Sequence, residues 1–259
     1  MSDEILALEG ARVRVDGATI LGPVDLEVRA GQHWVVLGPN GSGKTTLLTL
    51  AGARRQPSAG RVRVLGAELG RVDVRELRQR IGHVSHAVAD RLRPSIRAVD
   101  VVRTGASGVL ESWWLQGGRD EGLQALAAVG CEHLADREIG SCSLGERQRV
   151  LVARAMLGEH DLLLFDEPAA GLDLPARESL LAAMSALATR TDAHTTILAT
   201  HHLEEIPPTA THAILLRAGR PTAAGPVDRV LADEPMSSCF EMRISVQRRD
   251  GRWTARAAG

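Results

Sequence analysis

An eight-residue, glycine-rich loop constrains the fold of this chain more than any other feature of its sequence. The loop follows a mostly apolar run, His33–Leu37, and precedes a segment that contains Leu47, Leu48 and Leu50. A buried strand, a tight turn and a helix in this order predict an α/β fold. Glycines let backbone N–H groups converge on an anion, and the helix adds its positive N-terminal end, so the loop is predicted to bind phosphate. The loop reads Gly38-Pro39-Asn40-Gly41-Ser42-Gly43-Lys44-Thr45.

The composition points to the same loop. Of the 31 lysine and arginine residues only Lys44 is a lysine, and Asn40 is the only asparagine in the chain. A bias of the coding sequence against AT-rich codons explains this scarcity but not the position of the two residues. An arginine fork does not replace a lysine point charge at a tight phosphate site, so Lys44 is predicted to reach the β- and γ-phosphates of a nucleotide. The spacing is the Walker A pattern, G-x-x-x-x-G-K-T, in which Thr45 ligates Mg²⁺ and the residues from Gly38 to Thr46 surround the phosphates.

Two carboxylates follow a second apolar run. Residues 162–165 are Leu-Leu-Leu-Phe, and Asp166 and Glu167 come next. A central parallel strand is buried on both faces, which accounts for a continuous apolar run. The carboxyl end of such a strand lies at the ligand crevice of an α/β sheet. Asp166 is therefore predicted to hold Mg²⁺ and Glu167 to act as the general base, and the alternative is a pair of acids that only cap the strand.

Three further motifs follow the Walker A loop, and with them the chain resembles the ATP-binding cassette (ABC) ATPases. Residues 142–150, Cys-Ser-Leu-Gly-Glu-Arg-Gln-Arg-Val, resemble the ABC signature, L-S-G-G-Q-x-Q-R-V. Gly171-Leu172-Asp173 resembles the D-loop, and Thr200-His201-His202 resembles the switch histidine. Together with the Walker A loop and with Asp166 and Glu167, which correspond to the family's Walker B motif, they occur in the family's order, so the resemblance covers most of the chain.

The resemblance implies an α/β fold of the P-loop NTPase kind. A RecA-like core would carry an antiparallel β edge sheet and an inserted α-helical signature subdomain. The core would comprise residues 1–86 and 158–240, and the helical subdomain residues 87–157. Residues 241–259 would form a short C-terminal hairpin or tail.

The residues themselves agree with this fold at several points. Segment 5–29 alternates between apolar and polar residues, as short antiparallel strands do. Ser143 is a good N-cap for a helix over residues 144–157. Asp250-Gly251 is a strong signal for a two-residue hairpin turn near the C-terminus.

The resemblance also implies a partner and roles for the site residues. The family forms a head-to-tail dimer that encloses two ATP molecules, so a second cassette subunit is expected, together with the cofactors ATP and Mg²⁺. Ser143 and Gly145 of one chain would contact the γ-phosphate bound by the other, and Asp173 of the D-loop would also contribute to the nucleotide site. A serine N-cap and a glycine at a helix start form an anion-binding end. The residues expected to take part in catalysis are Glu167, His201 and Lys44.

Four positions depart from the family pattern. In the signature, Leu144 replaces a glycine and Glu146 replaces a glutamine. His86 stands where the Q-loop glutamine touches the Mg²⁺ site, and it is either a tolerated surface residue or a working part of that loop. Val15 stands where an aromatic residue normally stacks on adenine, and the chain has no tyrosine. Apolar atoms without a ring predict weaker selectivity for the base.

These features predict the ATP-binding and ATP-hydrolysing subunit of an ABC transporter. They resemble a branch near the molybdate and iron-complex import ATPases, so import through separate transmembrane permease subunits is expected. A net charge of −1 argues against nucleic acid as a partner. The sequence shows neither a signal peptide nor an apolar run of about 20 residues, so we expect a cytoplasmic protein held at the inner face of the membrane by its partner. A soluble, non-transport ABC ATPase in protein or complex assembly is the alternative.

Overall fold

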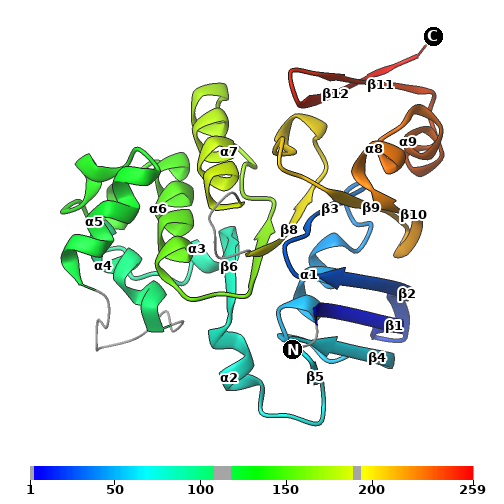
Figure 1. The fold of residues 1–259 in the computed structure, drawn as a ribbon, viewed down its shortest axis with the longest axis horizontal. Helices are drawn as coiled ribbons and strands as arrows, with labels where there is room; N and C mark the ends of the chain where they lie inside the picture. Colours follow the sequence, from blue (N-terminus) through cyan, green and yellow to red (C-terminus); the bar gives the residue numbers. More distant parts are fainter. Residues whose placement is uncertain (1–2, 108–117, 189–193, 259) are drawn as a thin grey trace.

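A six-stranded sheet forms the centre of the computed structural model, which describes residues 3–107, 118–188 and 194–258 apart from the side chains of residues 86, 87, 106 and 107. The strand order is β10-β9-β3-β8-β7-β6 (Figure 1). All neighbours from β9 to β6 pair in parallel, and β10 is an antiparallel edge strand. The strands are β3 (His33–Leu37), β6 (Ile81–Ser85), β7 (Leu162–Asp166), β8 (Thr195–Thr200), β9 (His212–Arg217) and β10 (Arg220–Pro226).

Both faces of this sheet are covered, which explains the apolar run in β7. Leu162 and Leu164 belong to the hydrophobic cluster that includes Leu47 and Leu48 of helix α1 (Lys44–Ala51). Their alternating neighbours, including Phe165, belong to a second cluster with residues of α6 (Leu144–Leu157) and α7 (Leu174–Ala188). A parallel strand buried on both sides carries apolar residues at successive positions. The predicted α/β fold is confirmed.

A second, antiparallel sheet has the order β2-β1-β4-β5 and lies beside the central sheet (Figure 1). Its strands are β1 (Glu4–Val15), β2 (Ala18–Arg29), β4 (Ala59–Val64) and β5 (Ala67–Glu68). The expected antiparallel sheet is therefore present, but the expectation of short strands over residues 5–29 is wrong, because β1 and β2 have 12 residues each. Register shifts, one of them between Leu8 and Ala11, absorb irregular positions such as Gly10 and let each strand continue.

The helices between β6 and β7 gather on the side of the molecule remote from the antiparallel sheet (Figure 1). Helices α4 (Ala98–Arg103), α5 (Arg119–Ala128) and α6 share one hydrophobic cluster. Helix α6 begins after Ser143, as its sequence predicts, and Ser143 and Glu146 form a capping box: the Ser143 Oγ accepts from the Glu146 N–H and the Glu146 carboxylate accepts from the Ser143 N–H. The shorter helices are α2 (Val74–Gln79), α3 (His86–Ala89), η1 (Thr104–Ser107), η2 (Glu132–Leu134), η3 (Ile139–Ser141) and η4 (Leu203–Glu205).

The C-terminal part folds back on the central sheet. It contains α8 (Val227–Val230), α9 (Asp233–Phe240) and the antiparallel pair β11 (Ile244–Arg249) and β12 (Arg252–Ala257). Asp250 and Gly251 join the two strands, and both have positive φ, as a two-residue hairpin turn requires. Within the described part of the chain, no helix combines the length and the apolar character needed to cross a membrane.

Candidate active site

The parallel strands bring the predicted site residues to one edge of the central sheet. Leu37 at the end of β3 aligns with Thr200 at the end of β8, and Asp166 at the end of β7 aligns with Ala199. The residues that directly follow these strands therefore meet at the carboxyl edge, where α/β sheets bind their ligands.

The backbone of the glycine-rich loop is closely packed against its surroundings. A Cβ atom added to Gly38 would lie 2.0 Å from the carbonyl oxygen of Leu216, so no side chain fits there. Gly41 and Gly43 have φ values of 77° and 99°, which side chains disfavour. The Ser42 hydroxyl is buried and has no hydrogen-bond partner among the described residues. A buried hydroxyl without a partner in a loop of converging amides fits a phosphate oxygen.

Lys44 crosses back over the loop that precedes it. Its side chain is 5% exposed, and its Nζ donates to the carbonyl oxygens of Gly38 at 3.0 Å and Pro39 at 3.2 Å. The same Nζ lies 3.3 Å from the Oε1 of Glu167. A buried ammonium held by carbonyl and carboxylate oxygens presents a point charge to an anion at this edge.

Thr45 and Asp166 form a pair of oxygen donors beside Lys44. The Thr45 Oγ1 donates to the Asp166 Oδ1 at 3.1 Å. Hydroxyl and carboxylate oxygens are hard ligands of the kind that Mg²⁺ takes while it keeps several waters. The pair therefore fits the predicted metal. Of the other predicted phosphate-binding residues, Asn40 is exposed at the loop surface, and Pro39 and Thr46 are half-buried.

Glu167 has a strained backbone and stands between two nitrogen groups. Its φ is 47°, in the left-handed region that a residue with a side chain rarely adopts, and its N–H donates to the Ala199 carbonyl at 2.9 Å. The Nδ1 of His201 lies 3.4 Å from the Oε1 of Glu167, the atom that also faces Lys44. The Glu167 and His201 side chains are 30% and 27% exposed, so water reaches this carboxylate.

The signature segment and the D-loop pack together as a second group. A Cβ added to Gly145 would lie 2.9 Å from the Cβ of Ala176 in α7, so glycine allows the two helices to approach. Asp173 caps α7, because its Oδ1 accepts from the Ala176 N–H at 3.0 Å. Among the residues that the structure describes, neither Ser143 nor Gly145 forms a hydrogen bond or ion pair with the phosphate loop. Within one chain the two groups are therefore separate.

The structure describes the side chain of Val15 but not that of His86, the two departures that concern the nucleotide site. His86 is the first residue of α3, directly after β6, and its side chain lies outside the described part of the structure. Val15 ends β1 and is 39% exposed, and Ile20 on the paired strand β2 is 37% exposed. The Ile20 carbonyl oxygen would lie 3.1 Å from a Cβ on Gly43, so an exposed apolar strand pair borders the phosphate loop.

Sequence reasoning missed the contacts that fix the turn after β8. The Thr200 hydroxyl donates to the Glu205 carboxylate, and the His202 N–H donates to the Thr200 Oγ1 at 3.1 Å. Thr200 is fully buried and Glu205 is 5% exposed. This pair sets the path of the chain on either side of His201. The sequence offers only a threonine and a glutamate five positions apart, which is no distinctive pattern.

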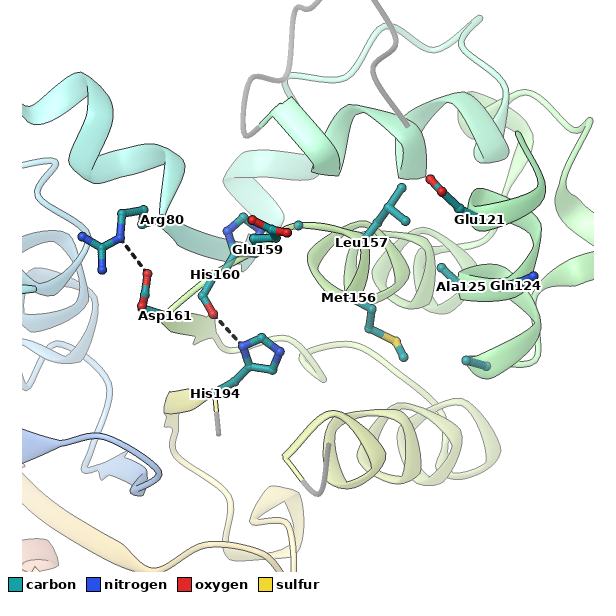
Figure 2. A pocket seen from close by; sticks show the side chains of 12 residues that line it. Arg80, Glu121, Gln124, Ala125, Met156, Leu157, Glu159, His160, Asp161 and His194 are labelled. Atoms are coloured by element: carbon teal, nitrogen blue, oxygen red, sulfur yellow. Dashed lines mark hydrogen bonds and ion pairs between the residues drawn. The ribbon is translucent and has the colours of Figure 1, made fainter. Parts of the chain in front are cut away.

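A cavity of about 950 Å³ lies at the opposite, amino edge of strands β6, β7 and β8 (Figure 2). Arg80 and Asp161 form an ion pair of 2.8 Å on its wall, and the His194 Nδ1 donates to the His160 carbonyl oxygen at 2.5 Å. Burial lowers the pKa of His160 to about 4, so this imidazole is neutral at pH 7. None of the predicted catalytic residues lines the cavity, and no group of three metal-ligating side chains was found in the described parts of the chain.

Comparison with known proteins identifies the family. Residues 21–170, more than half of the chain, match the sequence model of the family described as ABC transporter. The chain belongs to the ABC transporter family. It is an ATP-binding cassette subunit whose reaction is ATP hydrolysis, and the two sheets and the helical region have the architecture of such a cassette.

Individual relatives match nearly the whole chain. It is 35% identical over 246 residues to the uncharacterized ABC transporter ATP-binding protein YlmA of Bacillus subtilis, which covers 93% of both chains. It is 34% identical over 249 residues to the hemin import ATP-binding protein HmuV of Streptomyces coelicolor, which covers 94% of this chain and 86% of the relative. A solved chain from a transporter described as of metal-chelate type, in an inward-facing conformation, has a TM-score of 0.78 and 25% identity over 98% of this chain and 97% of that chain.

Lys44 gives the first testable prediction. Lys44→Ala is expected to weaken ATP binding at least about a hundredfold, because the buried point charge at the loop is lost. Lys44→Arg is the matched variant, and it is expected to fail as well, since a planar fork does not fit where the ammonium contacts two carbonyl oxygens and Glu167. Equilibrium binding of a fluorescent ATP analogue measures both. Wild-type affinity in Lys44→Arg would contradict the role given to the point charge.

Proposed function

We propose that this cassette hydrolyses ATP at a site shared by two copies of the chain and that it powers import through separate membrane subunits. The observation that carries the proposal is the placement of one Glu167 oxygen 3.3 Å from Lys44 and 3.4 Å from His201. This carboxylate is partly exposed at the mouth of an anion-binding loop. It is therefore available to a water molecule next to a bound terminal phosphate.

The proposed reaction assigns one task to each side chain. Lys44 and the loop amides hold the β- and γ-phosphates of ATP. A water oxygen bonds to the γ-phosphorus while the bond between that phosphorus and the bridging oxygen to the β-phosphate breaks. Glu167 orients this water and accepts its proton, which leaves ADP and inorganic phosphate as products. His201 keeps the Glu167 carboxylate in position and contacts the γ-phosphate.

Thr45 and Asp166 are the proposed ligands of a Mg²⁺ ion. When bound, the ion neutralises charge on the phosphate oxygens during transfer. The Asp166 carboxylate and the Thr45 hydroxyl, which lie 3.1 Å apart, would hold the ion with their side-chain oxygens. Thr45 lies in the first turn of α1 and Asp166 ends β7, so regular structure fixes the positions of both residues.

A second copy of the chain would complete the site. The N-terminus of α6 carries Ser143 and Gly145, and a 14-residue helix that begins with a serine cap attracts anions. Within one chain Gly145 lies against Leu172 and Ala176, and Ser143 is bonded to Glu146 of its own helix. In a head-to-tail dimer Ser143, Gly145 and the adjoining Asp173 of one copy would face the γ-phosphate held by Lys44 of the other.

Import is the direction that the relatives favour. HmuV of Streptomyces coelicolor is named a hemin import protein, and the solved chain comes from a transporter described as of metal-chelate type. These names support the branch near the iron-complex import ATPases, a transmembrane permease as partner, and a location at the inner face of the membrane. A soluble cassette that acts in protein or complex assembly is the second candidate.

The two candidates predict different partners. A tagged chain purified from detergent-solubilised membranes of its own organism is expected to bring with it a protein with several membrane spans, in a fixed ratio. ATP hydrolysis by that complex in lipid vesicles is expected to rise when a binding protein and its cargo are added. Purification with soluble proteins alone, and no membrane protein above the level in an untagged control, would favour the assembly ATPase.

Glu167→Gln tests the chemistry of hydrolysis. The amide keeps the shape of the side chain but accepts a proton poorly, so turnover is expected to fall by about a hundredfold or more while ATP binding persists. The uncleaved nucleotide should hold two chains together, and size-exclusion chromatography with ATP and Mg²⁺ should show a dimer. Turnover at the wild-type rate in this variant would exclude Glu167 as the base.

Ser143→Arg tests the shared site. The added cation and bulk should block the clamp on the neighbouring γ-phosphate, so hydrolysis is expected to be lost while ATP binding to the single chain stays near normal. Mixing this protein with Lys44→Ala protein provides the control. In a head-to-tail heterodimer one site carries both changes and the other carries neither, so partial activity should return. Full activity of Ser143→Arg on its own would argue against the shared site.

A further inference from the structure

Arg252, the first residue of β12, joins three separate parts of the chain. Its Nη1 and Nη2 donate to the two carboxylate oxygens of Glu178 at 2.6 Å and 3.0 Å. The Nη2 also donates to the backbone carbonyl of Glu204 at 2.7 Å. A bidentate guanidinium–carboxylate pair has a fixed geometry, and the third bond extends it to the main chain of η4. One side chain of the C-terminal hairpin thus connects α7 to the turn after β8.

Both contacts of Arg252 lead to residues of the active site. Glu178 lies in the helix that Asp173 of the D-loop caps. Glu204 lies in η4, two residues after His202, and its neighbour Glu205 accepts a hydrogen bond from the buried Thr200 that precedes His201. A continuous series of hydrogen bonds and adjacent residues therefore runs from Glu178 through Arg252 to the residues on either side of His201.

The hairpin that carries Arg252 is itself firmly attached. Trp253 is 5% exposed and lies in the same hydrophobic cluster as Leu203, the first residue of η4, and Ile206, which follows η4. The guanidinium of Arg248, on the paired strand, lies 5.0 Å above the Trp253 ring. Because its backbone is held by this packing, Arg252 can impose a position on the turn after β8.

We propose that Arg252 is a positioning residue for ATP hydrolysis, which holds the turn after β8, and with it the His201 imidazole, in register with Glu167. The inference rests on the roles proposed above for His201 and Glu167. Arg252 lies outside residues 21–170, the part of the chain that matches the family model. The hydrogen bonds from Arg252 hold the pKa of the Glu178 carboxyl below its ordinary value, so the pair stays charged at neutral pH.

A second cation lies close to Glu178. The Nε of Arg177 is 3.8 Å from the Glu178 Oε1, so Glu178 keeps a charged neighbour when Arg252 is removed. The loss that matters in Arg252→Ala is therefore the hydrogen bond to the Glu204 carbonyl oxygen. No other described side chain donates to this oxygen. A lysine at position 252 keeps the charge but lacks the fork that reaches both partners.

The test compares Arg252→Ala with Arg256→Ala, a matched loss of an exposed arginine on the same strand. A misplacement of about 1 Å near reacting groups costs up to roughly a hundredfold in rate, and we expect a fall in kcat of about tenfold for Arg252→Ala. ATP affinity and the thermal unfolding midpoint should change little, and Arg256→Ala should match the wild type. Arg252→Lys should lie between the two. If Arg252→Ala does not fold, Arg252→Lys serves in its place, because the shorter reach of its single ammonium cannot hold both Glu178 and the Glu204 carbonyl.

A double variant separates positioning from general damage. Because Arg252 acts through His201, adding Arg252→Ala to His201→Ala should cause no further loss in single-turnover hydrolysis, whereas independent effects would multiply. A kcat for Arg252→Ala within about twofold of the wild type, or an undiminished further loss in the double variant, would overturn the inference. If His201→Ala alone hydrolyses ATP normally, the role proposed for His201 is wrong, and the inference about Arg252, which depends on it, is wrong as well.

Discussion

One carboxylate oxygen of Glu167 lies close to both the Lys44 ammonium and the His201 imidazole, and the surrounding structure holds these groups together. A charge as buried as that of Lys44 is stable only with close compensation, which two loop carbonyls and Glu167 supply. The parallel registers of β3, β8 and β7 bring the three residues to one edge. The left-handed backbone of Glu167, fixed by its bond to Ala199, turns the carboxylate towards the loop.

The predicted site residues form two groups, one at the edge of the central sheet and one at the start of α6. The phosphate loop, Asp166 and Glu167 lie at the carboxyl edge of the central sheet, while Ser143 caps α6 and Gly145 in its first turn packs against α7. A cassette built in this way presents a cationic loop on one surface and an anion-attracting helix end on another. In the proposed head-to-tail dimer these two surfaces would face each other, which would give a physical reason for coupling hydrolysis to the approach of two subunits.

Much of this could be predicted from the sequence, because its main elements depend on local patterns. The strand over His33–Leu37, the loop that follows it and the helix that begins after Ser143 each have a periodic or motif signature, and the structure has them. The lengths of β1 and β2 were beyond prediction, since register shifts let these strands pass glycines that usually end a strand. The bond between Thr200 and Glu205, and the bridge from Arg252 to Glu178, 74 residues away, depend on tertiary packing that no local pattern encodes.

The most direct test of this account is a structure of the Glu167→Gln protein with ATP and Mg²⁺. The account predicts two copies in head-to-tail arrangement, with the γ-phosphate held by Lys44 of one copy and contacted by Ser143 of the other. The metal should lie between Thr45, Asp166 and the phosphate oxygens, and His201 should contact the γ-phosphate. A nucleotide whose phosphates contact only one chain, or one that lies away from residues 38–46, would contradict the account.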